Sequence, residues 1–156
     1  ASPVTEADIA VDRFLKAQLG EARPHFGWLS EETVDDPARL GCREVFIVDP
    51  IDGTRAFAAG LPDWTISLAV VRDGRPVAAA LAGPKPMTMK VERHGAVALP
   101  KIHSLALRFA KVAAGEIDAG FAGGQSHDWD LAAADLLVHE AGASLTGLDG
   151  TAPSYN

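Results

Sequence analysis

The strongest fold signal in the sequence is a short apolar run that leads into two closely spaced carboxylates. Residues 45–48 are β-branched or aromatic, Asp49 and Pro50 follow them, and Asp52 stands two residues further on. β-Branched and aromatic residues favour strands, and a proline interrupts a regular ladder. We therefore predict a buried strand over 44–49 that stops at Pro50, with Asp49 at its carboxyl end.

Two further strand-like runs lie downstream, at 64–71 and 76–82. Asp73 and Gly74 stand between them, and an Asp-Gly pair supplies the positive φ angles of a tight hairpin turn. The two runs are therefore expected to pair as antiparallel strands.

Three segments have the spacing and the end signals of helices. Thr5 and Asp8 form a capping pair before apolar positions at helical spacing, which predicts a helix over 5–19. Helices are also predicted over 104–114, with a serine cap, and over 129–141, with a glycine just past its end. Together with the strands they indicate a mixed α and β fold (α/β or α+β).

The chain is expected to form one domain, 1–156, because no linker or repeat divides it. Its N-terminal part, 1–83, carries the strands, and 104–150 carries the later helices. The stretch 84–103 is rich in proline and has no sustained period, with at most a brief strand at Met87–Val91, so it stays unplaced and is a candidate place for chain gaps.

Composition excludes several functional classes. The chain has 14 basic and 21 acidic residues, a net charge of −7, which argues against nucleic acid or an anionic membrane as the main partner. No apolar run approaches the roughly 20 residues that span a bilayer. A single cysteine, Cys42, cannot form an internal disulfide, so we expect a cytoplasmic protein.

The turn after the first predicted strand carries the residues best suited to chemistry. Asp49 and Asp52 would converge as oxygen ligands for a hard cation such as Mg²⁺. Gly53 would let a phosphate approach the backbone, and Thr54 offers a hydroxyl that could orient water. The alternative is an ordinary acidic turn, which composition alone favours.

Three other acidic motifs are each explained by ordinary structure when taken alone. Glu31 and Glu32 suit a solvated loop, Asp8 suits a cap partner, and Asp128 and Asp130 suit the first turn of a helix.

Taken together and in this order, the motifs resemble the inositol monophosphatase family. The resemblance rests on Pro-Val-Thr-Glu-Ala-Asp at 3–8, Ser-Glu-Glu at 30–32, Asp-Pro-Ile-Asp-Gly-Thr at 49–54, and Trp-Asp at 129–130 before an Ala-rich helix that ends in Glu-Ala-Gly. It covers 3–82 and 104–150. It implies the layered α/β/α/β/α sugar-phosphatase fold, incomplete in this chain, and a phosphatase that depends on Mg²⁺ and is inhibited by Li⁺.

The resemblance also implies a role for each matching position. Two or three Mg²⁺ ions would be bound by Glu31, Asp49, the Ile51 carbonyl, Asp52 and Asp130, with Glu32 behind them. The catalytic group would be Asp8, Thr54 and Glu31. The substrate phosphate would be bound by Asp52, Gly53 and Thr54. A homodimer acting on a small phosphate monoester through metal-activated water is expected.

The substrate class is less closely defined. The segment 123–127 lacks the glutamate that inositol-specific members place there, and 27–33, 55–57 and 101–108 look most like bacterial 3′(2′),5′-bisphosphate nucleotidases. The best hypothesis is therefore 3′-phosphoadenosine 5′-phosphate. A second phosphate would meet Lys101, His103 or Arg108, although a solvated basic face explains these residues at least as well.

Two alternative functions stay open. One is a phosphatase for inositol 1-phosphate or another sugar or polyol phosphate. The other is a non-catalytic module for metal binding or dimerisation, which the unusual length of the chain motivates.

The chain is short for the family it resembles, and we expect pieces of a longer protein joined end to end, with joins in 84–101, near 124–126 and after Gly150. Removing the six site acids from the charge sum leaves 15 acids against 14 basic residues. Most of the net charge is therefore expected to belong to one metal site.

Overall fold

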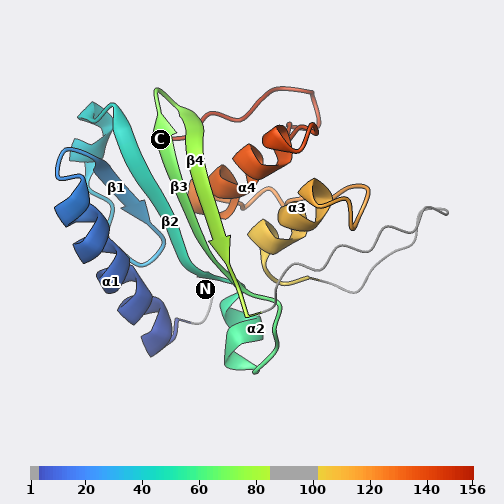
Figure 1. Ribbon diagram of the computed structural model, residues 1–156, viewed down its shortest axis with the longest axis horizontal. Coiled ribbons are helices and arrows are strands. Elements are labelled where there is room, and N and C mark those ends of the chain that lie inside the picture. Colours follow the sequence, from blue (N-terminus) through green and yellow to red (C-terminus); the bar gives the residue numbers. More distant parts are fainter. Residues whose placement is uncertain (1–3, 85–101) are drawn as a thin grey trace.

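The computed structural model describes residues 4–84 and 102–156, which are built around a four-stranded mixed sheet (Figure 1). The strands stand in the order β1 (Gly27–Ser30), β2 (Glu44–Asp52), β3 (Thr65–Arg72) and β4 (Arg75–Ala82). β1 runs parallel to β2, and the other two pairs are antiparallel. The predicted hairpin is confirmed, since its turn has φ angles of 51° at Asp73 and 76° at Gly74.

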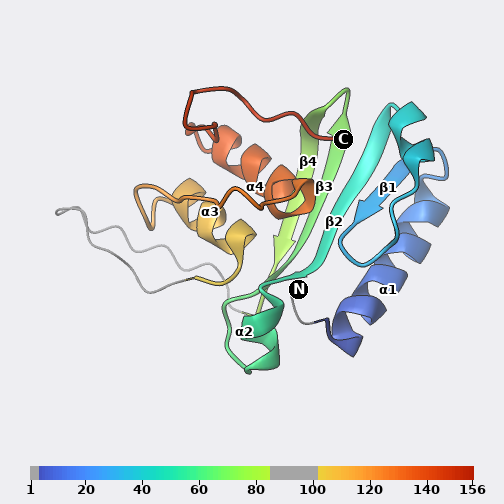
Figure 2. The ribbon, with the colours of Figure 1, turned by 180° about the vertical axis from the view of Figure 1, so that it is seen from behind.

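Helices cover both faces of the sheet. α1 (Glu6–Ala22) lies on one side, and α3 (Leu105–Ala113) and α4 (Asp128–Glu140) lie on the other (Figures 1 and 2). These three helices confirm the predicted ones. The described part thus has three α/β/α layers, a mixed α+β fold, and contains no helix with both the length and the apolar character of a membrane span.

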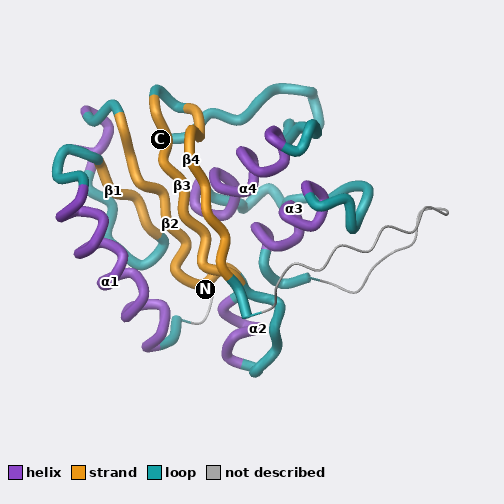
Figure 3. Tube along the Cα trace, viewed as in Figure 1, coloured by secondary structure: helices purple, strands orange, loops and turns teal. Residues whose placement is uncertain are grey.

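Three short elements were not predicted: β1, the 3₁₀-helix η1 (Pro37–Gly41) and α2 (Thr54–Ala58), which follows β2 directly. Figure 3 shows β1 coloured as a strand and α2 as a helix. The brief strand considered at Met87–Val91 lies outside the described residues.

Residues 45–48 of β2 are apolar because both faces of the strand are buried. Val45 and Ile47 face α4 and pack with the alanines at 132 and 133, whose small side chains let the helix lie close to the sheet. Phe46 points to the opposite face, where its ring lies 5.1 Å from Phe26 and 6.2 Å from Trp28 between ring centroids. This double burial fixes the strand that carries the candidate ligands.

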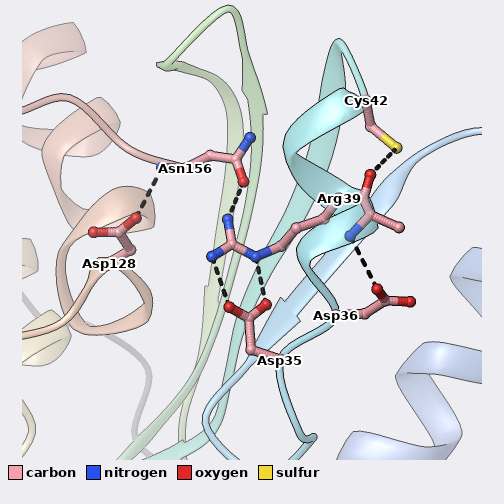
Figure 4. Close-up of polar contacts among 7 residues, drawn as sticks. Asp35, Asp36, Arg39, Cys42, Asp128 and Asn156 are labelled. Carbon is pink, nitrogen blue, oxygen red and sulfur yellow. Dashed lines mark hydrogen bonds and ion pairs between the residues drawn. The ribbon is translucent and has the colours of Figure 1, made fainter.

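The last residues pack back onto the start of α4 and onto η1. The backbone N–H of Asn156 donates to Asp128 at 2.8 Å, and Arg39 donates both to the Asn156 side chain and to Asp35 (Figure 4). Tyr155 is buried and belongs to the same hydrophobic core as Val45, Ile47 and the alanines of α4. Asp128 therefore helps to hold the C-terminal residue against α4.

Candidate metal centre

A β-bulge near the end of β2 turns two carboxylates toward the same side of the sheet. Asp49 pairs with Ser67 of β3, and Asp52 pairs with Thr65. Asp52 is three residues after Asp49 on β2, but their partners on β3 are only two residues apart. Residues three apart in a regular strand face opposite sides, and the extra residue of a bulge cancels that alternation. The prediction that the strand stops at Pro50 was wrong, because β2 continues to Asp52. Pro50 lies within the bulge, where its missing N–H breaks no regular ladder hydrogen bond.

Asp130, in the first turn of α4, brings a third carboxylate to the same place. Oxygen atoms of Asp49, Asp52 and Asp130 all lie within 4.8 Å of one another. The backbone N–H of His127 donates to Asp130 Oδ2 at 2.7 Å, and the His127 ring stacks on Trp129. Three of the four acids predicted as metal ligands thus converge from elements that are far apart in sequence.

Neutral donors hold Asp52 in place. Ser104 Oγ and the backbone N–H of Ala106 both donate to Asp52 Oδ2, at 2.7 and 2.5 Å. Ser104 is fully buried, and its Oγ also lies 3.1 Å from Thr65 Oγ1. Sequence reasoning recognised Ser104 only as a helix cap, since its contact with Asp52 spans 52 residues.

Asp49 carries the clearest sign that a cation belongs here. Its carboxylate is buried, and among the described residues Asp49 Oδ1 finds no hydrogen-bond partner. A buried acceptor without a partner costs free energy, and a carboxylate set of hard oxygens is the donor set that Mg²⁺ prefers. The residues present therefore fit a divalent metal ion.

The loop after β1 brings Glu31 to the same cavity. The backbone N–H of Glu31 donates to Val48 O at 3.3 Å, which extends the parallel β1–β2 pairing by one residue. Ser30 and Thr33 on either side donate to Asp12 of α1. The sequence analysis did not identify Asp12 as part of the site. Asp12 follows Asp8 by one helical turn and so lies on the same buried face of α1.

The predicted pair of Asp8 and Thr54 is in contact. Thr54 Oγ1 lies 3.3 Å from Asp8 Oδ1 and 3.0 Å from the Ile51 carbonyl oxygen, and its hydroxyl can donate to either acceptor. Asp8 also caps α1, because it accepts hydrogen bonds from the backbone and hydroxyl of Thr5. Gly53, with φ 95°, makes the turn between β2 and α2, and a Cβ there would lie 2.8 Å from the Asp63 carbonyl.

These residues surround an open cavity of about 210 Å³. Its lining residues are Glu31, Asp49, Ile51, Asp52, Gly53, Thr54, Arg55, His103 and Asp130. They include every residue predicted to bind metal, to take part in catalysis or to bind the reacting phosphate, except Asp8 and Glu32. Arg55 and His103 supply the basic groups of the cavity.

Another basic candidate, Arg108, is not among the residues that line the cavity. Arg108 donates to the carbonyls of Ile102 and Phe121, each at 2.6 Å, so its guanidinium is engaged by backbone. Lys101 lies outside the described residues.

The clustered acids bind protons more tightly than isolated ones do. Burial, and then the charge of Glu32 and other acids, raises the pKa of Glu31 to about 7. Burial raises the pKa of Asp52 to about 6, against the lowering effect of its hydrogen bonds. Burial and the neighbouring carboxylates raise the pKa of Asp49 well above its usual range. The metal-free site therefore holds protons that a metal ion would displace.

Comparisons with known proteins identify similar sequences and structures. The model of the inositol monophosphatase family matches residues 1–98 and 85–156. A histidinol-phosphatase from Mycobacterium tuberculosis is 30% identical, over 97% of this chain and 76% of that protein. A 3′-phosphoadenosine 5′-phosphate phosphatase from Mycobacterium leprae is 28% identical, over 96% and 71%. The native crystal structure of extragenic suppressor protein suhB from Bartonella henselae is 27% identical and superposes with a TM-score of 0.77, over 96% of this chain and 76% of that one.

The same comparisons show an internal difference in length. The alignment with the histidinol-phosphatase runs over 201 positions, against 156 residues in this chain, so at least 45 positions of that relative have no counterpart here. The two matched pieces of the family model overlap at 85–98.

Proposed function

This chain belongs to the inositol monophosphatase family of phosphoric monoester hydrolases, and we propose that it hydrolyses a small phosphate monoester with Mg²⁺ bound by the cavity acids. The observation that carries the proposal is the convergence of Asp49, Asp52 and Asp130 in one cavity. The contact between Thr54 and Asp8 beside that cavity adds a group that can handle a proton.

The metal ligands in this proposal are Glu31, Asp49, the Ile51 carbonyl, Asp52 and Asp130, with Glu32 behind them. Bound Mg²⁺ would lower the pKa of water and offset the charge of the phosphate. Asp52 and the backbone N–H groups of Gly53 and Thr54 would contact the phosphate oxygens.

The chain's own residues would guide the proton of the attacking water. When the Thr54 hydroxyl donates to Asp8 Oδ1 and not to the Ile51 carbonyl, the lone pairs of Thr54 Oγ1 can accept a hydrogen bond from water. As the water oxygen bonds to phosphorus, its proton passes to the Thr54 hydroxyl and the hydroxyl proton passes to Asp8. The P–O ester bond breaks, the alcohol leaves with a proton from solvent, and Asp8 then releases its proton to solvent.

We propose a 3′(2′),5′-bisphosphate nucleotide, such as 3′-phosphoadenosine 5′-phosphate, as the substrate. Arg55 and His103 line the cavity beside the acids, where they could pair with a second phosphate. A guanidinium suits phosphate because its donors match two oxygens at once. On this basis Arg55→Ala should lower kcat/KM for the bisphosphate by about tenfold or more and leave a monophosphate nearly unaffected.

The test is phosphate release from 3′-phosphoadenosine 5′-phosphate, inositol 1-phosphate and histidinol phosphate, each with Mg²⁺ and with EDTA. Asp130→Asn should abolish turnover. Asp128→Asn is the matched control, because Asp128 stands two residues earlier and contacts Asn156 instead. Turnover that persists in EDTA would overturn the metal mechanism.

Histidinol phosphate is the second candidate substrate, because a relative of that name is 30% identical. A higher kcat/KM for it, or for inositol 1-phosphate, would replace the bisphosphate hypothesis and leave the metal mechanism standing. Metal binding without turnover of any of the three would support a non-catalytic binding module instead.

Three finer proposals rest on the family: Li⁺ as an inhibitor, a homodimer and a cytoplasmic location. Inhibition by millimolar LiCl, light scattering after gel filtration and cell fractionation test them in turn.

A further inference from the structure

We propose that Asp12 is a positioning residue for the metal centre, because its carboxylate fixes the segment that carries Glu31 and Glu32 against α1. The inference rests on the proposed function, in which Glu31 is a metal ligand. It assigns a task to a buried acid that neither the metal nor the substrate would touch.

Asp12 holds this segment at both ends. Ser30 Oγ donates to Asp12 Oδ1 at 2.5 Å, and Thr33 Oγ1 donates to Asp12 Oδ2 at 2.7 Å. The two hydroxyls stand immediately before and after Glu31 and Glu32, and each carboxylate oxygen serves one of them. Asp12 is only 6% exposed, so water competes little for these hydrogen bonds.

The backbone between the two hydroxyls is fixed from the sheet as well. Ser30 Oγ accepts a hydrogen bond from the Glu32 N–H at 3.4 Å while it donates to Asp12. The Glu31 N–H donates to Val48 O at 3.3 Å. Glu31 is therefore held between β2 and Asp12, which limits where its carboxylate can lie in the cavity.

The same helix also sets the distance between two parts of the site. Asp8 and Asp12 are one turn apart on the buried face of α1. Asp8 contacts Thr54, and Asp12 holds the segment with Glu31. α1 thus ties the proposed ligand Glu31 to the proposed proton-handling pair through two adjacent carboxylates.

A carboxylate suits this task better than an amide. Two hydroxyl donors need two acceptor atoms, and the side chain of asparagine has one acceptor and one donor group. Asp12→Asn should therefore release either Ser30 or Thr33 while it keeps the shape of the side chain. Thr33→Val removes a single hydrogen bond and is the milder variant.

The experiment measures Mn²⁺ binding to substrate-free protein by electron paramagnetic resonance, with thermal unfolding in EDTA alongside. Replacing groups that orient metal ligands commonly weakens metal affinity by about 10- to 100-fold. We expect Asp12→Asn to weaken Mn²⁺ binding about tenfold and Thr33→Val by a smaller factor. Glu21→Gln, at an exposed position near the end of the same helix, is the control for charge and should bind as the wild type does.

Unchanged Mn²⁺ affinity in both variants would overturn the proposal, whatever happens to the unfolding temperature, because it would make Asp12 a purely structural residue. If Asp12→Asn does not fold, the Thr33→Val result decides alone. A wild-type protein that binds no Mn²⁺ would instead refute the proposed function. Wild-type binding with unchanged variants refutes only the role of Asp12.

Discussion

Replacing Asp52 with asparagine should stabilise the metal-free protein and remove its activity. Burial raises the pKa of Asp52 from 3.8 to about 6. In the metal-free fold the ionised carboxylate is therefore disfavoured relative to the unfolded chain. A difference of about two pKa units corresponds to roughly 3 kcal/mol at a pH above both values.

The sign follows from proton linkage. Between pH 4 and pH 6 the folded state holds a proton at Asp52 that the unfolded state has lost, so the free energy of unfolding of the wild type falls as pH rises. Asparagine resembles the neutral acid and its oxygen can still accept from Ser104 and Ala106. The advantage of Asp52→Asn should grow from less than about 1 kcal/mol at pH 4 to on the order of 2 to 3 kcal/mol at pH 8.

The assay is thermal unfolding in EDTA at pH 4, 6 and 8, repeated with 10 mM Mg²⁺ taken as roughly saturating. For a domain of this size the expected gain at pH 8 is roughly 5 to 10 °C. Added Mg²⁺ should stabilise the wild type and not the variant. If the unfolding temperature of the variant at pH 8 in EDTA equals or lies below that of the wild type, the reasoning is refuted. Burial of the ionised Asp52 carboxylate would then not lower the free energy of unfolding.

Three further outcomes are expected. Ser104→Ala should lower the free energy of unfolding by about 1 kcal/mol, because α3 loses its N-cap, and chemical denaturation measures this loss. The same variant should bind Mg²⁺ more weakly, because Asp52 loses a hydrogen bond that orients it, and calorimetry measures the affinity. Gly53→Ala should destabilise the protein by more than about 1 kcal/mol, because φ is 95° and the Asp63 carbonyl lies 2.8 Å from the new Cβ, and its activity should fall too. Apparent Mg²⁺ affinity should rise between pH 5 and pH 8 as protons leave Asp52 and Glu31, and calorimetry in buffers of different ionisation enthalpy should detect proton release on binding.

Local chemistry made most of the elements predictable. The helix over 6–22 has its capping pair, and the Asp73–Gly74 turn has the residues that positive φ angles demand. β1 has four residues and α2 has five, which are too few to show the hydrophobic period of a strand or a helix. The sequence therefore did not predict them. The extension of β2 past Pro50 depends on a bulge with β3, which is a tertiary feature that residue preferences alone do not reveal.

Some residues of the candidate site could be predicted from the sequence and others could not. Asp49, Asp52 and Asp130 could be proposed as a set only through the order of their motifs, and the structure brings them together. Asp12 and Ser104 could not be proposed, because an acid and a serine at helix positions have ordinary explanations. Their partners lie 18 to 52 residues away, so the chain's fold decides those contacts.

The partners of the site acids differ in kind from those of the other acids. Arginine or lysine side chains pair with acids outside the site, in the pairs Asp35–Arg39, Asp73–Arg43, Glu44–Arg72 and Glu116–Lys111. Within 4–84 and 102–156, Asp8, Asp12, Asp52 and Asp130 instead accept from hydroxyls and backbone N–H groups. A fixed arginine would satisfy a carboxylate permanently and compete with a metal ion.

Neutral donors orient a carboxylate without cancelling its charge, so in the metal-free fold burial, and then repulsion from neighbouring acids, raises the pKa values of Glu31 and Asp49. A divalent cation that binds the folded state alone relieves that repulsion and adds stability in proportion to the logarithm of its concentration. Six of the 21 acids in the sequence belong to the proposed metal site. The donors that hold the ligands are as much a part of the proposed metal site as the ligands themselves.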